Sequence, residues 1–369
     1  MARRLPLPIQ TIYADLVDRC TIAAFDTDYP SNGSFVQVPV KGRVYWYFQQ
    51  GSKDESGRQP RKYVGPDIPE LAERIKKHGT IKSAYRERRQ LIAALRQSGL
   101  YAPPAETGDV LAAMAAAGVF RLRACVIGTV AYQTYGGLLG VKLADAAVQT
   151  GDVDIAQFRS ISIAIAEDDR TVPMRDILKS VDPSFRSVAY AQDGRIEATY
   201  VNDAQYRVEI LTPNRGPNTD TPQDLPALGT HAQPLRFLDY LIYEVVPAVV
   251  LHDGGVLVNV PRPERYALHK LIIAQRRREG AAKIDKDLRQ AEELLDVLAD
   301  RRKADLRDAW EEIMDRGPTW RRHVRESLEQ LDPKVWKKLA KIVGASAEPQ
   351  GAPEAAAEAS HEPEADTKP

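Results

Sequence analysis

Two aspartates one residue apart, Asp152 and Asp154, lie in the short apolar segment Thr150–Ile155. Alternate side chains of a strand point to the same face, so these two carboxylates would lie side by side. Such carboxylates repel each other and are costly to remove from water. Proteins tolerate them where a divalent cation is held between carboxylate oxygens and a substrate phosphate. The pair therefore predicts phosphoryl or nucleotidyl transfer with Mg²⁺ (or Mn²⁺) as the cofactor.

A third acid is predicted on a later strand, where Glu209 stands between Val208 and Ile210. A single glutamate in a strand usually faces solvent, and this strand alone favours neither that interpretation nor a functional one. Together with Asp152 and Asp154, Glu209 would complete a second metal position or take the proton from an attacking hydroxyl.

A phosphate contact is predicted at Gly128-Thr129, where a helix-like segment begins. Glycine lets the backbone approach a phosphate closely, and Thr129 offers a hydroxyl and a helix N-terminal amide to the same anion. The alternative is a strand-to-helix turn with a threonine cap.

A basic helix is expected over residues 264–279, with Lys270 and Arg277 two turns apart on one face. Apolar neighbours predict partial burial of Lys270, which then needs an anion such as a nucleoside triphosphate or the aspartate pair. The alternative is a surface helix whose basic side chains reach out to water. We expect His269 to pack rather than to act as a base.

The elements that must position these residues form a mixed α/β pattern between about residues 118 and 262. The expected elements are a strand over 120–127, a helix over 128–139, a strand over 152–155, a strand or helix edge over 161–166, a short helix over 174–180 and a hairpin of 195–201 with 206–211 that turns at Asn202-Asp203.

The flanking regions are predicted from periodicity and turn residues. On the N-terminal side we expect helices over 7–24, 69–78, 80–97 and 105–117, and strands over 35–40, 43–48 and 61–64. On the C-terminal side we expect a hairpin of 249–251 with 256–260, then helices over 263–279, 284–300, 304–315, 319–330 and 333–343. The domain boundaries that follow are 1–104, 105–262, 263–343 and a disordered acidic tail over 344–369.

The motifs resemble the nucleotidyltransferase fold of the DNA polymerase β-like superfamily: a Gly-Ser or Gly-Gly pair at a helix start, Asp-x-Asp on a strand, and an acid on a later strand. More closely, Gly128-Thr-Val-Ala-Tyr132 and Thr150-Gly-Asp-Val-Asp154 resemble a bacterial nucleotidyltransferase-fold family, over roughly residues 105–300. More distantly, Lys270, a following arginine and Lys286-Asp287 have the order seen in abortive-infection nucleotidyltransferase toxins.

The resemblance implies an α+β fold with a mixed-sheet nucleotidyltransferase (polymerase β-like) core, an N-terminal helix and β-ribbon region, and a helical C-terminal region. It also implies metal-dependent transfer of a nucleoside monophosphate from an NTP to an acceptor hydroxyl, with release of pyrophosphate. Three departures stand out: Thr129 where the superfamily has Ser or Gly, Glu209 where Asp is more frequent, and 24 residues between Gly128 and Asp152. They leave open the alternative of a catalytically weak nucleotide- or nucleic-acid-binding module.

Composition narrows the setting. With 43% hydrophobic and 28% charged residues and a formal charge of zero, the 369-residue chain is typical of soluble proteins. Two cysteines and an N-terminus interrupted by prolines predict a cytoplasmic protein with no transmembrane helix. Residues 41–97 hold fourteen Lys/Arg against six Asp/Glu. That excess fits an RNA or other acceptor, or equally a solvated surface. The base preference, the acceptor and the oligomeric state cannot be predicted from these patterns.

Overall fold

The structure is a computed structural model. It describes residues 2–29, 34–40, 43–49, 59–77, 81–144, 151–188, 190, 196–277 and 280–344. Thr150 of the aspartate motif and the predicted acidic tail beyond Gly344 lie outside the described residues.

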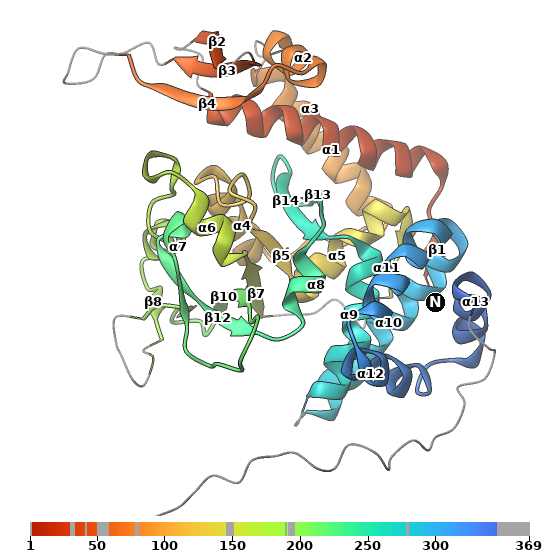
Figure 1. Cartoon of the computed structure of the whole chain (residues 1–369). Coiled ribbons are helices and arrows are strands. Elements are labelled where there is room, and N and C mark those ends of the chain that lie inside the picture. Colours follow the sequence, from red (N-terminus) through yellow and green to blue (C-terminus); the bar gives the residue numbers. More distant parts are fainter. Residues whose placement is uncertain are drawn as a thin grey trace, which may run out of the picture.

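A mixed sheet forms the centre of the molecule, and it confirms the predicted α+β fold class (Figure 1). Among the described residues it has seven strands, with β11, β12, β10, β7 and β5 in that spatial order and β8 and β9 attached beside β10. β7 pairs parallel to β10, and β10 parallel to β12, whereas β5 runs antiparallel to β7. The bounds are β5 Cys125–Ile127, β7 Asp152–Ala156, β8 Arg186–Ser187, β9 Thr199–Val201, β10 Arg207–Pro213, β11 Gln223–Leu225 and β12 Thr230–Leu235.

The predicted hairpin is confirmed, because Val201 of β9 lies opposite Arg207 of β10. Two other predictions need correction. The strand expected over 120–127 is only β5, because residues 118–123 form hydrogen-bonded turns in which Arg123 has a left-handed backbone with φ of 64°. Residues 161–166 contribute to the short helix α6 (Arg159–Ala164) rather than to a strand.

The N-terminal region packs over one side of the core (Figure 1). β1 (Arg3–Arg4) pairs with β6 (Val141–Lys142), and helix α1 (Leu7–Asp28) packs against α3 (Ile81–Gln97). The predicted ribbon is an antiparallel sheet of β2 (Ser34–Val40), β3 (Arg43–Gln49) and β4 (Arg61–Pro66), followed by α2 (Pro69–Lys77).

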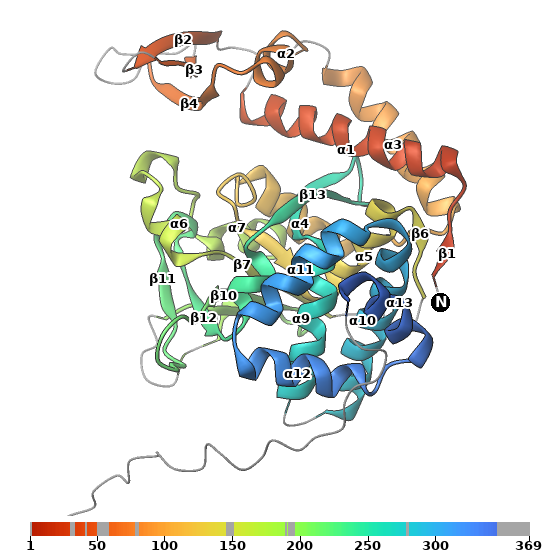
Figure 2. The ribbon, with the colours of Figure 1, turned by 45° about the vertical axis from the view of Figure 1, so that its right-hand side comes forward.

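The C-terminal region is helical, as predicted, and packs beside the sheet (Figure 2). Buried side chains of its helices belong to the same apolar cluster as those of the strands. The C-terminal helices are α9 (Pro263–Arg276), α10 (Ala281–Arg301), α11 (Lys303–Asp315), α12 (Pro318–Leu328) and α13 (Pro333–Val343). The remaining elements of the core are α4 (Ala105–Ala116), α5 (Gly128–Leu139), α7 (Met174–Val181), α8 (Leu238–Ile242), β13 (Val245–Val250) and β14 (Val256–Pro261). Within the described ranges, no helix combines the length and the apolar character needed to cross a bilayer.

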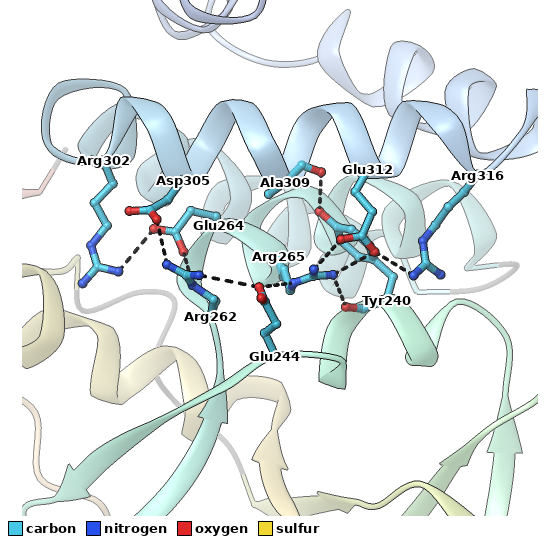
Figure 3. Close-up of polar contacts among 10 residues, drawn as sticks. All are labelled: Tyr240, Glu244, Arg262, Glu264, Arg265, Arg302, Asp305, Ala309, Glu312 and Arg316. Carbon is cyan, nitrogen blue, oxygen red and sulfur yellow. Dashed lines mark hydrogen bonds and ion pairs between the residues drawn. The ribbon is translucent and has the colours of Figure 1, made fainter. Parts of the chain in front are cut away.

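Arginine side chains at the start of α9 bind residues of α8 and α11, as Figure 3 shows. Arg262 donates to Asp305 of α11 at 2.8 Å. Arg265, which is buried, donates to Glu312 of α11 and to the carbonyl oxygen of Tyr240 in α8. Buried arginines are stabilised when carboxylates satisfy the guanidinium in this way. The N-terminal end of α9 is therefore fixed, and this orients the rest of the helix relative to the sheet.

Candidate active site

The pairing of β7 with β10 places the predicted acids together. Glu209 lies opposite Asp154 in the parallel register. The intervening residues Val153 and Val208 are completely buried on the other face of the sheet. Because side chains alternate along a strand, Asp152, Asp154 and Glu209 share the opposite face. The alternation of acidic and apolar residues along β7 and β10 therefore gives this sheet one acidic face and one apolar face.

Gly128 directly follows β5 and lies beside Asp154. The backbone conformation and the close approach of Asp154 both require a residue without a side chain at this position. Its backbone is left-handed, with φ of 65°. A Cβ atom at this position would lie 2.4 Å from Oδ2 of Asp154. An L-residue would therefore meet both backbone strain and a steric clash.

Helix α5 begins directly at this glycine. Its N-cap position is Ile127, and no side chain caps the helix. The alternative for Gly128-Thr129 is therefore right about a strand-to-helix turn, because β5 ends at Ile127 and α5 begins at Gly128, but wrong about a threonine cap. Thr129 itself is half-buried in the first turn.

The pKa of Asp154 is raised from its usual value to about 7. Burial is the largest cause, followed by the negative charges of Asp152 and Glu209. Lys270 and Arg277 act in the opposite direction, so both cations lie within electrostatic reach of the acids. A cation bound beside this carboxyl group would stabilise its ionised form.

The carboxylate of Asp287 in α10 accepts hydrogen bonds from both predicted basic residues. Lys270 donates to Oδ1 of Asp287 at 2.5 Å, and Arg277 donates to Oδ2 at 2.6 Å. The sequence left a triphosphate or the aspartate pair as the anion for Lys270, and the structure provides a third anion, Asp287. Lys270 is only 9% exposed, so the surface-helix alternative is wrong for it. Burial and the neighbouring Lys270 lower the pKa of Lys286, which precedes Asp287 on the same helix.

Glu209 has a contact that the sequence analysis did not predict. Its carboxylate lies 3.2 Å from Nε of Arg207, two residues earlier on β10. Across the described residues, no three or more His, Cys, Asp or Glu side chains are gathered closely enough to hold a metal ion. The role of Glu209 as a third metal ligand therefore stays a prediction.

Tyr266 is a site residue that the sequence analysis missed. Its hydroxyl lies 2.9 Å from the carbonyl oxygen of Gly128 and 2.9 Å from Oε1 of Gln290. Tyr266 and Lys270 are one helical turn apart, so the helical spacing that selected Lys270 would also have found it. His269, by contrast, is buried, and burial lowers its pKa to about 3, so it is neutral. This agrees with the packing role predicted for it.

The donor chemistry of the acidic face fits Mg²⁺ or Mn²⁺. Carboxylate oxygens are the ligands that hard divalent cations prefer. The raised pKa of Asp154 agrees with this chemistry, because Lys270 and Arg277 compensate the charge of this group only in part. Asp152 and Asp154 are the residues that would hold the ion, with Glu209 as the third candidate.

Comparison with known proteins gives one result that bears on this site. A protein-family model described as nucleotidyltransferase matches residues 105–315, which is more than half of the chain and contains every residue discussed above. Neither the search of curated proteins nor the search of solved structures found a significant match.

Proposed function

We propose that this chain, which belongs to the nucleotidyltransferase family, transfers a nucleoside monophosphate from an NTP to an acceptor hydroxyl and releases pyrophosphate. The observation that carries the proposal is the position of Asp154. It is surrounded by Asp152, Glu209 and the side-chain-free backbone of Gly128, and its pKa is raised to about 7. A site that concentrates negative charge next to a glycine turn is suited to a cation-bound phosphate.

Mg²⁺ or Mn²⁺, when bound, would neutralise phosphate charge and orient the NTP for in-line attack. Asp152 and Asp154 would hold the ion, and Glu209 would complete the ligand set or accept the proton from the acceptor hydroxyl. Gly128 and the first-turn amides of α5, with the hydroxyl of Thr129, face the phosphates.

Lys270 and Arg277 supply the positive charge on the opposite side of the NTP. Asp287 keeps their nitrogens in place before the substrate arrives, since its two carboxylate oxygens each accept one of them. Such preorganisation favours electrostatic stabilisation of a charged transition state, because no reorientation is needed during the reaction. The cytoplasm is the proposed setting, and both cysteines, which lie in the described part of the chain, are free.

A labelling experiment tests this function. The purified chain is incubated with each α-labelled NTP, Mg²⁺ or Mn²⁺, and a total cell extract. We expect transfer of label to an acceptor, and we expect Asp152→Ala with Asp154→Ala to reduce it at least a thousandfold. Asp224→Ala is the matched control, because Asp224 is an exposed acid on β11 of the same sheet.

The competing function is the nucleotide- or nucleic-acid-binding module without turnover. It predicts metal-dependent NTP binding in wild type, measured by equilibrium dialysis, with no transfer of label to any acceptor. Unchanged NTP binding in the double variant, together with no transfer of label, would show that the acidic face takes part in neither nucleotidyl transfer nor NTP binding.

A further inference from the structure

A charged cavity lies at the far ends of β10 and β12, away from the acids. It has a volume of about 670 Å³ and lies between the segments that follow these strands and the first turn of α12. Four arginines line it, Arg215, Arg236, Arg276 and Arg316, against one acid, Asp239. A protein with a formal charge of zero thus places strong positive charge in a single concavity.

These arginines converge on common partners. Arg316 donates to Oδ2 of Asp239 at 2.6 Å, and Nε of Arg215 lies 4.0 Å from the same oxygen. Arg316 also lies over the ring of Trp320, and Arg276 lies over the ring of Phe237. Since those two rings contact each other, with centroids 4.5 Å apart, the guanidinium groups face one shared space.

Most of this positive charge is left for a ligand. Arg316 is neutralised by Asp239 and Glu312. Among the described residues, Arg276 and Arg236 form no ion pair, and Arg236 donates only to the neutral Asn218. Arg215 lies over the ring of Phe158, and its one ion pair is the distant contact with Asp239. Stacking on an aromatic ring orients a guanidinium while its N–H groups stay available, which suits bidentate binding of phosphate. The N-terminal end of α12 adds a partial positive charge to the same cavity.

The cavity is connected to the acidic face by two elements. β10 carries Glu209 and leads, after five residues, into Asn214 of the cavity lining, a span of about 17 Å at the usual rise of a strand. At the end of α9, Arg277 is bound to Asp287 while the adjacent Arg276 lines the cavity. A chain bound in the cavity could therefore extend toward the acids.

We propose that this arginine cavity binds the sugar-phosphate backbone of a single-stranded polynucleotide, which serves as the acceptor. Arginines recognise phosphates by bidentate hydrogen bonds, and a positively charged groove can follow the flexible backbone of a single strand. The aromatic rings are already covered by guanidinium groups or by each other, so the binding follows the backbone rather than the bases. The assignment of the strand as acceptor rests on the proposed function, whereas the binding does not.

Binding is measured by fluorescence anisotropy with labelled 20-nucleotide RNA and DNA strands, without NTP or divalent ions. We expect Arg215→Ala with Arg276→Ala to weaken binding of both strands about tenfold and to reduce the salt-dependence slope by about 1.4. Both arginines are exposed, and Arg215→Lys with Arg276→Lys should retain more of the affinity than the alanine pair. The matched control is Arg170→Ala with Arg186→Ala, two exposed arginines that do not line the cavity, which should leave the affinity unchanged.

Unchanged affinity in the Arg215/Arg276 variant, an equal loss in the control, or a strict preference for RNA or DNA would overturn the proposed surface. The labelling assay then separates the two proposals. Label on a component of the extract, but none on a bound strand, would overturn the acceptor assignment and leave the proposed function standing. No label on any acceptor would overturn the proposed function and leave the binding surface standing.

Discussion

Two aspartates of the same site, the half-buried Asp154 and the buried Asp287, have pKa values shifted in opposite directions. The pKa of Asp154 is raised to about 7, and the pKa of Asp287 is lowered. Burial acts to raise the pKa of both, and it is the largest cause in each case. What differs is the neighbouring charge: Asp154 has two carboxylates beside it, whereas Asp287 accepts hydrogen bonds from Lys270 and Arg277.

This difference separates an ion cluster that is complete without a ligand from an acidic face that requires one. Asp287 is fully compensated by two protein cations, so its charge stabilises the packing of α9 on α10. Asp154 feels the same two cations only at a distance, so its charge is compensated incompletely. Incomplete compensation is what a cation-binding face requires before the cation arrives.

The comparison is tested most strongly by removing the compensated acid. Asp287→Ala leaves Lys270 and Arg277 without their carboxylate, and Lys270 is deeply buried. Breaking one side of a buried ion pair costs about 3–5 kcal/mol, so we expect the free energy of unfolding to fall by about this amount. Urea unfolding at pH 7 followed by circular dichroism measures it.

The matched control is Asp285→Ala, an exposed acid two residues earlier on α10. It should change the free energy of unfolding by less than about 0.5 kcal/mol. Equal effects of the two variants would mean that the cluster around Asp287 is not buried as described.

The uncompensated acid should behave in the opposite way. The native state keeps the Asp154 proton up to about pH 7, whereas the unfolded state loses it near pH 4. The contribution of Asp154 to the free energy of unfolding therefore falls as pH rises from 4 to 7, because this group keeps its proton in the native state but loses it in the unfolded state in that window. Asp154→Asn removes this titration, so the free energy of unfolding of the variant should rise relative to that of wild type by about 4 kcal/mol between pH 4 and pH 8.

Urea unfolding with EDTA at both pH values measures this gain. Asp152→Asn is the comparison variant: it removes one like charge from beside Asp154 and should recover only part of the gain. Adding Mg²⁺ at pH 8 should stabilise wild type but not Asp154→Asn. A constant difference between Asp154→Asn and wild type across the pH range would contradict the environment described for Asp154.

The acidic face was accessible from sequence because its evidence is local. The alternation of acids with Val153 and Val208 predicts both the strand and the side of the sheet on which the acids lie. Gly128 could be identified in the same way, since a glycine directly after an apolar strand is typical of a close backbone approach. The helices after residue 262 follow a clear 3.6-residue period, and their predicted bounds agree with the structure within a few residues.

The features that the sequence analysis missed depend on tertiary contacts. The strand expected from Phe120 begins only at Cys125, because Asn259 of β14 binds the carbonyl oxygens of Phe120 and Ala124 and holds the turn. The anion for Lys270 was not identified, since Asp287 is 17 residues away and approaches only when α10 packs on α9. The arginine cavity combines residues from four segments, so no local pattern could indicate it.

The smallest expected effect on stability concerns the third acid, Glu209. Its side chain is 38% exposed and pairs with the half-exposed Arg207. An ion pair in water contributes about 0–1 kcal/mol, so Glu209→Gln should change the free energy of unfolding by less than about 1 kcal/mol. If Glu209 is a metal ligand, the same variant should still weaken Mn²⁺ binding at least tenfold, as measured by isothermal titration calorimetry. Glu167→Gln, an exposed acid outside the site, is the control and should change neither quantity. Unchanged Mn²⁺ affinity in Glu209→Gln would limit the metal ligands to Asp152 and Asp154 and leave Glu209 as a partner of Arg207.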